Sequence, residues 1–144
     1  MSSQANILVI DDDETLRDWC EKILSQAGNR VATAEDGLKG LDILKKKSFD
    51  LIILDLKMPG LSGMEVLKKV NEEYPETSVV IITGQATVES AVEGMKMGAY
   101  DFIPKPFTPE SFMKAIKQVL EKRRYQKKTT GEKEPEPNGE GFFW

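Results

Sequence analysis

Histidine is absent from the 144-residue chain, and cysteine occurs once, at Cys20. Without histidine, the chain cannot supply a Ser-His-Asp or Cys-His nucleophile system, a histidine general base or a histidine-ligated zinc site. A single cysteine cannot form an intramolecular disulfide, and Cys20 falls within an apolar helical pattern, where we expect a small buried side chain. The chemistry of this chain must therefore rest on carboxylates.

Long hydrophobic runs are also absent, and no segment approaches the roughly 20 apolar residues that a membrane span needs. Residues 1–6 lack the basic-then-apolar pattern of a signal peptide. The net charge of -4 gives no general basis for nucleic-acid binding, which usually leaves a strongly basic surface. We therefore expect a cytoplasmic protein without direct membrane or nucleic-acid contacts.

Short apolar runs rich in β-branched residues alternate with stretches of helical periodicity. The runs lie at residues 7–10, 31–34, 51–54, 79–82 and 100–103. Runs that are apolar throughout, such as Leu51–Leu54, are typical of strands covered on both faces of a parallel sheet. The sequence thus predicts an α/β fold with five strands and five helices.

Capping residues mark the ends of the expected helices. Gly28 can take a positive φ after the first helix, while Asp36 and Ser62 can cap the second and third. Thr108 as N-cap with Pro109 at the first helical position gives the strongest start signal. The helices are expected at residues 14–27, 37–46 and 63–74, from about 86 to Gly98, and from 109 onward.

The composition changes after residue 120, and we place the end of the folded domain near residue 124. Residues 121–128 read as a charged extension of the last helix, and residues 129–141 are rich in Gly, Pro and Glu. The segment 125–144 is therefore predicted to be a disordered tail. Its apolar tip, residues 142–144, is either a docking motif or a remnant without function.

Polar residues follow the predicted strands at the edge where open α/β sheets bind ligands. The acids Asp11, Asp12 and Asp13 follow the first strand and Asp55 follows the third. Such a cluster binds a hard divalent cation, and oxygen ligands without His or Cys favour Mg²⁺, Mn²⁺ or Ca²⁺. The alternative is that the acids only start a helix, and Asp13 is expected to do that as its N-cap.

Asp55 follows a buried strand and precedes a Pro-Gly turn, and a carboxylate there can attack phosphorus to form an acyl phosphate. Phosphoryl transfer needs a metal, a cation and hydrogen-bond donors around the phosphoryl oxygens. Lys105 supplies the cation, Thr83 a hydroxyl, and Lys57 a backbone carbonyl as a metal ligand. Taken singly, Thr83 could be a strand-end residue and Lys105 a surface lysine.

Together these residues resemble the receiver domain of two-component response regulators over roughly residues 5–124. The resemblance rests on the ILVIDDD run at residues 7–13, DLKMPG at 55–60, Thr83-Gly84 and KPF at 105–107. It implies a flavodoxin-like, doubly wound parallel sheet of order 2-1-3-4-5 with helices on both faces, and a cis peptide bond before Pro106.

The resemblance also assigns roles to the residues of the site. Asp55 would be the phosphoacceptor, Asp11 and Asp12 the acidic pair for Mg²⁺, with Mn²⁺ as a substitute, Thr83 the switch hydroxyl and Lys105 the phosphate-sensing lysine. A receiver of this kind is a phosphoacceptor that assists its own phosphorylation and dephosphorylation, and it is not otherwise an enzyme.

A receiver couples the hydroxyl of Thr83 to an aromatic residue on strand five, here Phe102, and so changes the surface of helix four, strand five and helix five. Phe102 stands where the family often has tyrosine, and a plain core role is the alternative. The implied partners are a sensor histidine kinase or phosphotransfer protein, an output domain, and a second copy bound through that surface.

Residues 83–86 and 95–102 look more specifically like receivers joined to sigma-54-dependent transcription activators. We expect either a receiver that acts alone or one that belongs to a larger regulator.

Other functions fit the sequence less well. A receiver-like interaction domain that needs no phosphorylation usually lacks one of the acids, the threonine or the lysine. A Mg²⁺-dependent phosphatase would want a general acid where Lys57 stands. A Rossmann domain would carry a G-x-G-x-x-G turn after the first strand, and none is present.

Overall fold

A computed structural model describes residues 4–84 and 86–132 of the chain. Within them, strands and helices alternate in chain order. The strands are β1 (Asn6–Ile10), β2 (Arg30–Ala34), β3 (Leu51–Leu54), β4 (Ser78–Thr83) and β5 (Asp101–Pro104). The helices are α1 (Glu14–Gln26), α2 (Gly37–Lys46), α3 (Gly63–Glu73), α4 (Val88–Lys96) and α5 (Pro109–Glu132).

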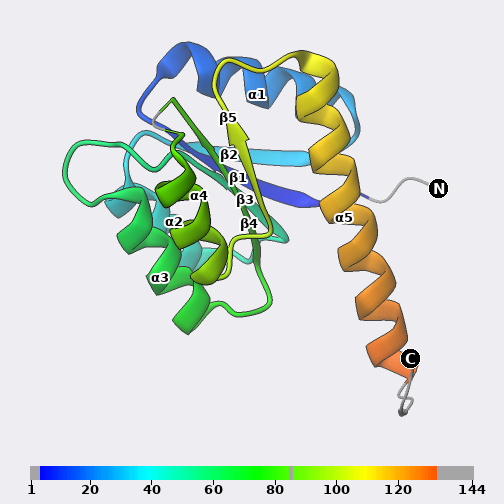
Figure 1. Cartoon of the computed structure of the whole chain (residues 1–144). Helices are drawn as coiled ribbons and strands as arrows, with labels where there is room; N and C mark the ends of the chain where they lie inside the picture. The colour runs from blue at the N-terminus through cyan, green and yellow to red at the C-terminus, as the bar shows by residue number, and fades with distance from the viewer. Residues whose placement is uncertain (1–3, 85, 133–144) are drawn as a thin grey trace.

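The strands form one parallel sheet in the order β2-β1-β3-β4-β5 (Figure 1), as expected. Strand β3 lies at the centre, and all four of its side chains are fully buried. Successive side chains point to opposite faces, so Leu51 and Ile53 join one core cluster while Ile52 and Leu54 join the other. This explains why the run is apolar throughout, and each such side chain contributes roughly 1.5–3 kcal/mol by its burial.

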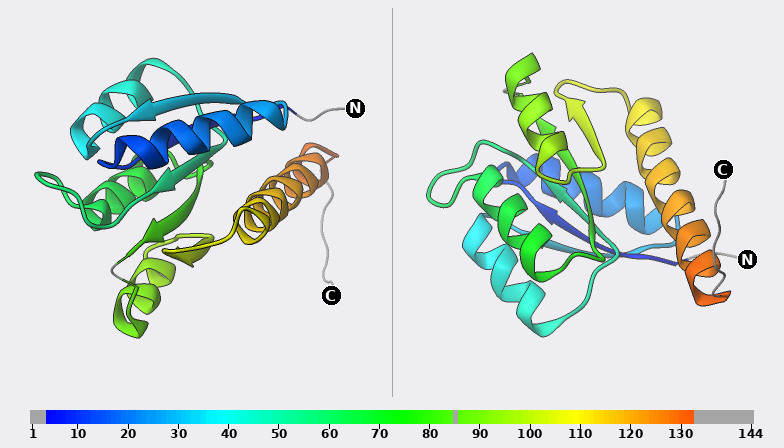
Figure 2. Two further views of the ribbon diagram at one scale, coloured as in Figure 1. Left: turned by 90° about the horizontal axis from the view of Figure 1, so that it is seen from above. Right: turned by 60° about the horizontal axis from the view of Figure 1, so that its bottom comes forward.

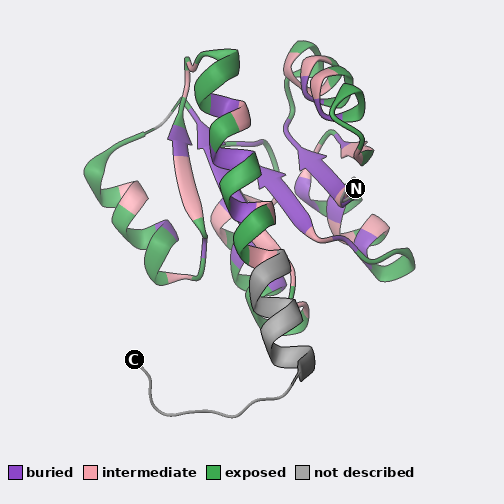
Figure 3. Ribbon diagram, turned by 90° about the vertical axis from the view of Figure 1, so that its right-hand side faces the viewer, coloured by how far each residue is buried: buried purple, intermediate pink, exposed green. Residues whose placement is uncertain are grey.

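Helices cover both faces of the sheet, α1 and α5 on one side and α2, α3 and α4 on the other (Figures 1 and 2). The apolar stripe predicted for α1 faces the sheet through the buried side chains of Cys20 and Leu24. Helix α5 also faces the sheet, through Phe112, Ile116 and Val119. Figure 3 shows the result, with a buried sheet between helices whose outer sides are exposed.

Most helix ends lie where the capping residues predict them. Asp13 and Asp36 cap α1 and α2 with their side chains, and Ser62 caps α3 within a capping box. Gly28 has φ +96, as predicted for the residue after the first helix.

Helix α4 differs from the prediction, because it starts at Val88 and not near Ala86. Thr87 is its N-cap and forms a capping box with Ser90. The segment before it contains position 85, which lies outside the described residues.

Helix α5 continues to Glu132, past the domain boundary predicted near residue 124 and into the segment predicted to be disordered. Figure 1 shows this helix extending beyond the sheet. The rest of the predicted tail, including the apolar tip at 142–144, lies outside the described residues. Among the helices that are described, none combines the length and apolar character that crossing a membrane requires.

Candidate functional site

The backbone ladder of the sheet brings the polar residues to one edge. The amide of Asp11 donates to the Ala34 carbonyl (3.1 Å), and the amide of Asp55 donates to the Ile10 carbonyl (3.0 Å). Each of these bonds continues the parallel pairing one step beyond a strand. Asp11 and Asp55 therefore leave the sheet side by side, at its carboxyl edge.

Asp11 is fully buried, and both of its carboxylate oxygens accept hydrogen bonds. Oδ1 accepts from the backbone amide of Asp13 (2.9 Å), and Oδ2 accepts from Nζ of Lys105 (3.0 Å). Its backbone carbonyl accepts a further bond from Nη1 of Arg17 (2.8 Å). The orientation of Asp11 is thus determined by residues from three parts of the chain.

Asp55 is only 5% exposed, and its two carboxylate oxygens also have donors. Oδ1 accepts from the backbone amide of Lys57 (3.2 Å), and Oδ2 accepts from Nζ of Lys105 (3.4 Å). The start of α3 packs against the same turn, because the amide of Gly63 donates to the Leu56 carbonyl (2.9 Å).

Lys105 reaches the two carboxylates from the far side of β4. Its amide donates to the Thr83 carbonyl (2.9 Å), and its peptide bond to Pro106 is cis, as the resemblance implied. The next residue, Phe107, stacks on Phe112 and contacts Trp19, with ring centroids 5.3 and 5.6 Å apart. This aromatic cluster holds the segment that carries Lys105 against α1 and α5.

An open cavity of about 460 Å³ lies over these residues. Thr83, fully buried at the end of β4, contributes to its wall. The lining residues are Asp12, Asp55, Lys57, Met58, Pro59, Thr83, Gly84 and Lys105. A small anionic group can therefore enter from solvent and meet a carboxylate, an ammonium group and a hydroxyl at once.

The family model described as the response regulator receiver domain matches residues 7–117. This chain belongs to the response regulator receiver domain family. The match covers every residue of the site described above and every strand except the first residue of β1.

Curated relatives of the receiver domain include transcriptional regulators. The chain is 38% identical over 123 residues to the C4-dicarboxylate transport transcriptional regulatory protein DctD of Pseudomonas aeruginosa, covering 85% of this chain and 26% of that protein. It is 38% identical over 120 residues to the transcriptional regulatory protein FixJ of Bradyrhizobium diazoefficiens, covering 83% and 58%. The chain thus spans between about a quarter and three fifths of these relatives' lengths.

Solved structures confirm the fold of the receiver domain. A CheY-like receiver domain protein from Methanospirillum hungatei superposes with a TM-score of 0.82 at 31% identity, covering 86% of this chain and 99% of that one. NtrX from Brucella abortus superposes with a TM-score of 0.86 at 32% identity, covering 91% and 30%. These similarities confirm the predicted flavodoxin-like order of the sheet.

The structure brings together most of the residues predicted for the receiver site. Asp12, Asp55, Thr83 and Lys105 line one cavity, and Asp11 lies beneath them in contact with Lys105. Lys57 lines the same cavity and its amide contacts Asp55, while the role of its carbonyl as a metal ligand stays a prediction.

Phe102 is placed apart from the cavity. It pairs in register with Ile81 on β4 and packs, partly buried, against the core cluster beneath α3 and α4. Its coupling to Thr83 stays a prediction.

Sequence reasoning missed two contacts within the receiver site. Arg17 reads as an ordinary charged residue on the exposed side of a helix, and no spacing rule points to its bond with the Asp11 carbonyl. Nothing in the sequence marks Gly63, which follows the Ser62 cap. Its α-carbon nevertheless lies so close to the Asp55–Leu56 backbone that an added β-carbon would be 2.3 Å from the backbone carbonyl oxygen of Asp55.

Lys105 offsets part of the negative charge in the receiver site. Burial raises the pKa of the Asp11 carboxyl, and the bonds from Asp13 and Lys105 act in the opposite direction. Burial alone would lower the pKa of Lys105, but the hydrogen bond and charge of Asp11, together with Asp55, raise it above its usual value. Lys105 therefore stays protonated and partly neutralises the two acids.

The donor set of the receiver site fits a hard divalent cation. Carboxylate oxygens of Asp11, Asp12 and Asp55 lie within 4.8 Å of one another. Two of the three groups are buried, and burying adjacent carboxylates is costly unless a cation accompanies them. Oxygen ligands of this kind suit Mg²⁺ and Mn²⁺, with room left for water and a phosphoryl oxygen.

Proposed function

We propose that this receiver domain is a phosphorylation-dependent switch in which Asp55 accepts a phosphoryl group from a phosphohistidine of a sensor kinase or phosphotransfer protein. The observation that carries the proposal is the environment of Asp55. The carboxylate is nearly buried, both of its oxygens are held by donors, and it opens onto the cavity beside a second acid and a lysine.

The transfer needs one carboxylate oxygen of Asp55 to attack phosphorus. The bond between phosphorus and the donor nitrogen breaks, an acyl phosphate forms, and the imidazole leaves on the partner molecule. The Lys57 amide fixes the carboxylate by holding Oδ1, so that reactant positioning is set before the donor arrives. The donor histidine lies outside these 144 residues, which contain none.

Lys105 and Thr83 then bind the new phosphoryl group. Nζ of Lys105 already lies 3.4 Å from Oδ2 of Asp55, close enough to stabilise the negative charge on the transferring phosphoryl group. Thr83 stands in the same cavity wall with a hydroxyl that can donate to a phosphoryl oxygen.

Asp11, Asp12 and Asp55, with the Lys57 carbonyl, would hold Mg²⁺, with Mn²⁺ as a substitute. When bound, the ion neutralises the charge of the transferring phosphoryl group.

The signal would leave through α4, β5 and α5. Only Gly94 of α4 is buried, while Val88, Val92 and Met95 are 80, 47 and 46% exposed. A helix held by so small a buried face can shift when Thr83 and Phe102 rearrange. Its exposed apolar side suits an output domain or a second copy of the chain.

The place of this domain in the cell follows from the same proposal. We propose a cytoplasmic receiver that serves a regulator of transcription, of the kind that acts with sigma-54, without itself touching membrane or nucleic acid. The names of the relatives, which are transcriptional regulatory proteins, support the link to transcription.

The test is intact-mass spectrometry after incubation with acetyl phosphate, with and without Mg²⁺, beside the Asp55→Asn variant. We expect a Mg²⁺-dependent gain of one phosphoryl group that the variant does not show. Asp50→Asn is a matched control. Asp50 precedes β3, at the end away from the site, and its carboxylate contacts Arg123. No gain in any condition would favour a receiver-like domain that signals by binding alone.

A further inference from the structure

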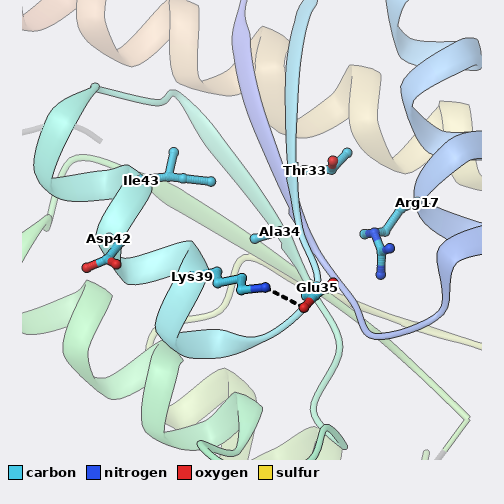
Figure 4. Close-up of a pocket in the computed structure, with 7 residues that line it drawn as sticks. All are labelled: Arg17, Thr33, Ala34, Glu35, Lys39, Asp42 and Ile43. Atoms are coloured by element: carbon cyan, nitrogen blue, oxygen red, sulfur yellow. Dashed lines mark hydrogen bonds and ion pairs between the residues drawn. The ribbon is translucent and has the colours of Figure 1, made fainter.

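Arg17 connects helix α1 to the backbone of Asp11, one of the predicted metal ligands. Its side chain extends from α1 toward the end of β2 and lines a second open cavity of about 390 Å³ (Figure 4). Thr33, Glu35 and Lys39 also line that cavity, and Lys39 is paired with Glu35 (2.5 Å). Arg17 makes a different contact, since its Nη1 donates to the Asp11 carbonyl at 2.8 Å.

This bond fixes the peptide that joins Asp11 to Asp12. The Asp11 amide is already bound to the Ala34 carbonyl of β2 (3.1 Å), so Arg17 holds the other end of the same residue. With both ends held, the peptide plane between the two acids cannot rotate freely.

The position of the Asp12 carboxylate depends on this peptide more than the position of the Asp11 carboxylate does. The carboxylate of Asp11 is held directly by Asp13 and Lys105. The carboxylate of Asp12 is exposed, and no side chain described between residues 4 and 123 donates a hydrogen bond to it or forms an ion pair with it. The backbone that Arg17 fixes therefore sets the direction of the Asp12 Cα–Cβ bond, and so limits where its carboxylate can lie.

We propose that Arg17 is a positioning residue for the cation: by holding the Asp11 carbonyl it fixes the angle at which Asp12 meets the ion, and so favours Mg²⁺ over Ca²⁺. This inference rests on the metal site of the proposed function. Mg²⁺ demands near-octahedral ligand geometry at short distances, whereas Ca²⁺ accepts longer and more variable geometry. Loosening Asp12 thus weakens Mg²⁺ binding more than Ca²⁺ binding.

When Arg17 is replaced, a positioning role and a simple charge effect predict opposite changes in the affinity for Mg²⁺. A guanidinium group near the site repels any divalent cation, so removing its charge alone strengthens the binding of both ions. Removing a positioning bond weakens the binding of Mg²⁺ selectively. The ratio of the two affinities therefore separates the two effects, and loss of overall stability does not change it.

The experiment is calorimetric titration of the full chain with Mg²⁺ and with Ca²⁺. Arg17→Met removes the donor and keeps the aliphatic stem, and Arg17→Gln keeps a polar side chain of shorter reach. For both variants we expect about tenfold weaker Mg²⁺ binding and less than about threefold change for Ca²⁺. Arg17→Lys, which retains a donor, should recover part of the selectivity.

Lys39→Ala is the matched control, because it removes a positive charge from the same cavity without a bond to Asp11. Its Mg²⁺ to Ca²⁺ ratio should equal that of the parent. Circular dichroism confirms that each variant is folded, and a folded Arg17→Gln alone suffices if Arg17→Met does not fold.

Two results would overturn the inference, and they differ in what they say about the proposed function. If the parent binds Mg²⁺ and the variants keep its ratio, or bind both ions more tightly, the role of Arg17 is wrong and the metal site stands. If the parent binds no Mg²⁺, the metal site itself is wrong, and the role of Arg17 is wrong with it.

Discussion

The Cys20 thiol lies on α1 without exposed surface, and burial, helped by the charge of Asp11, raises its pKa from an ordinary 9.0 to about 12. The unfolded chain releases this proton near pH 9, while the folded chain keeps it. The contribution of the protonated Cys20 thiol to the unfolding free energy is therefore complete below pH 9 and is lost as the pH rises from there through about 12.

We predict that this loss amounts to roughly 1.4 kcal/mol of unfolding free energy per pH unit above 9. Urea denaturation at pH 8 and pH 10 measures it, and Cys20→Ala separates it from the titration of lysines and tyrosines. The variant should be less stable at pH 8 but lose less stability between the two pH values. Equal losses in parent and variant would contradict the prediction.

At the scale of residues, the sequence predicted side chains that act on their immediate neighbours along the chain. Asp13, Asp36 and Ser62 cap helices within three positions of themselves, so local spacing is enough to find them. The bond from Arg17 to the Asp11 carbonyl also spans few residues, but it depends on how α1 leaves the sheet. No pattern in the sequence encodes that angle.

At the scale of elements, the start of α3 packs tightly against the turn that follows Asp55. A β-carbon at Gly63 would meet backbone atoms, lying 2.3 Å from the carbonyl oxygen of Asp55 and 2.4 Å from the Leu56 α-carbon. Backbone atoms in a buried turn cannot move aside easily, so an added methyl group must push α3 and the turn after β3 apart.

We predict that Gly63→Ala lowers the unfolding free energy by about 2–3 kcal/mol and slows phosphorylation of Asp55 by acetyl phosphate. Gly94→Ala is the matched control within a helix. The one close contact of its β-carbon would be the end of the Ile81 side chain at 2.6 Å, with Met64 and Phe102 side chains at an ordinary 3.9 Å, and alanine favours helix by about 1 kcal/mol. Urea denaturation and mass spectrometry compare the variants, and equal stability of the two would show that the close approach at Gly63 is relaxed in solution.

The elements themselves were predictable because each run of apolar residues has a length and period of its own. Strand β3 and helix α1 matched closely, since burial on both faces or on one face leaves a clear pattern. The start of α4 was wrong because its capping box uses Ser90, where the usual signal is glutamate or glutamine.

At the scale of the whole molecule, Arg123 ties α5 to the edge of the sheet opposite the site. Its Nη2 lies 3.3 Å from Oδ1 of Asp50, and its Nη1 donates to the Glu76 carbonyl and to the Ser78 hydroxyl. Asp50 also accepts from the amide of Asn6 at the start of β1 (2.8 Å). One arginine thus joins the last helix to the beginnings of three strands.

We predict that Arg123→Ala lowers the unfolding free energy by about 1.5–3 kcal/mol, because its bonds involve a charged donor and are partly buried. Phosphorylation of Asp55 should be unchanged, since the contact lies at the other edge. Lys69→Ala, which breaks an exposed pair with Glu73, should change stability by less than about 1 kcal/mol. A loss in Arg123→Ala no larger than in Lys69→Ala, measured by urea denaturation, would contradict the prediction.

The arrangement of the whole molecule was beyond what periodicity could give. Five apolar strands can be ordered in many ways, because their hydrophobic faces are interchangeable and hydrogen bonding of the backbone does not depend on sequence. The order β2-β1-β3-β4-β5 and the cis bond at Pro106 were predicted only through the resemblance to receivers. Clustering of the polar residues then followed from the parallel direction of the strands.

The ion pair between Lys105 and Asp11 joins residues 94 positions apart, and this separation matters while the protein is being made. A ribosome adding roughly 5–20 residues per second exposes Asp11 on the order of 5–20 seconds before Lys105. Throughout that interval, the acids that follow the first strand are on the nascent chain without the ammonium group that partly neutralises them. The ion pair of the receiver site therefore forms only after the last strand of the sheet has been made.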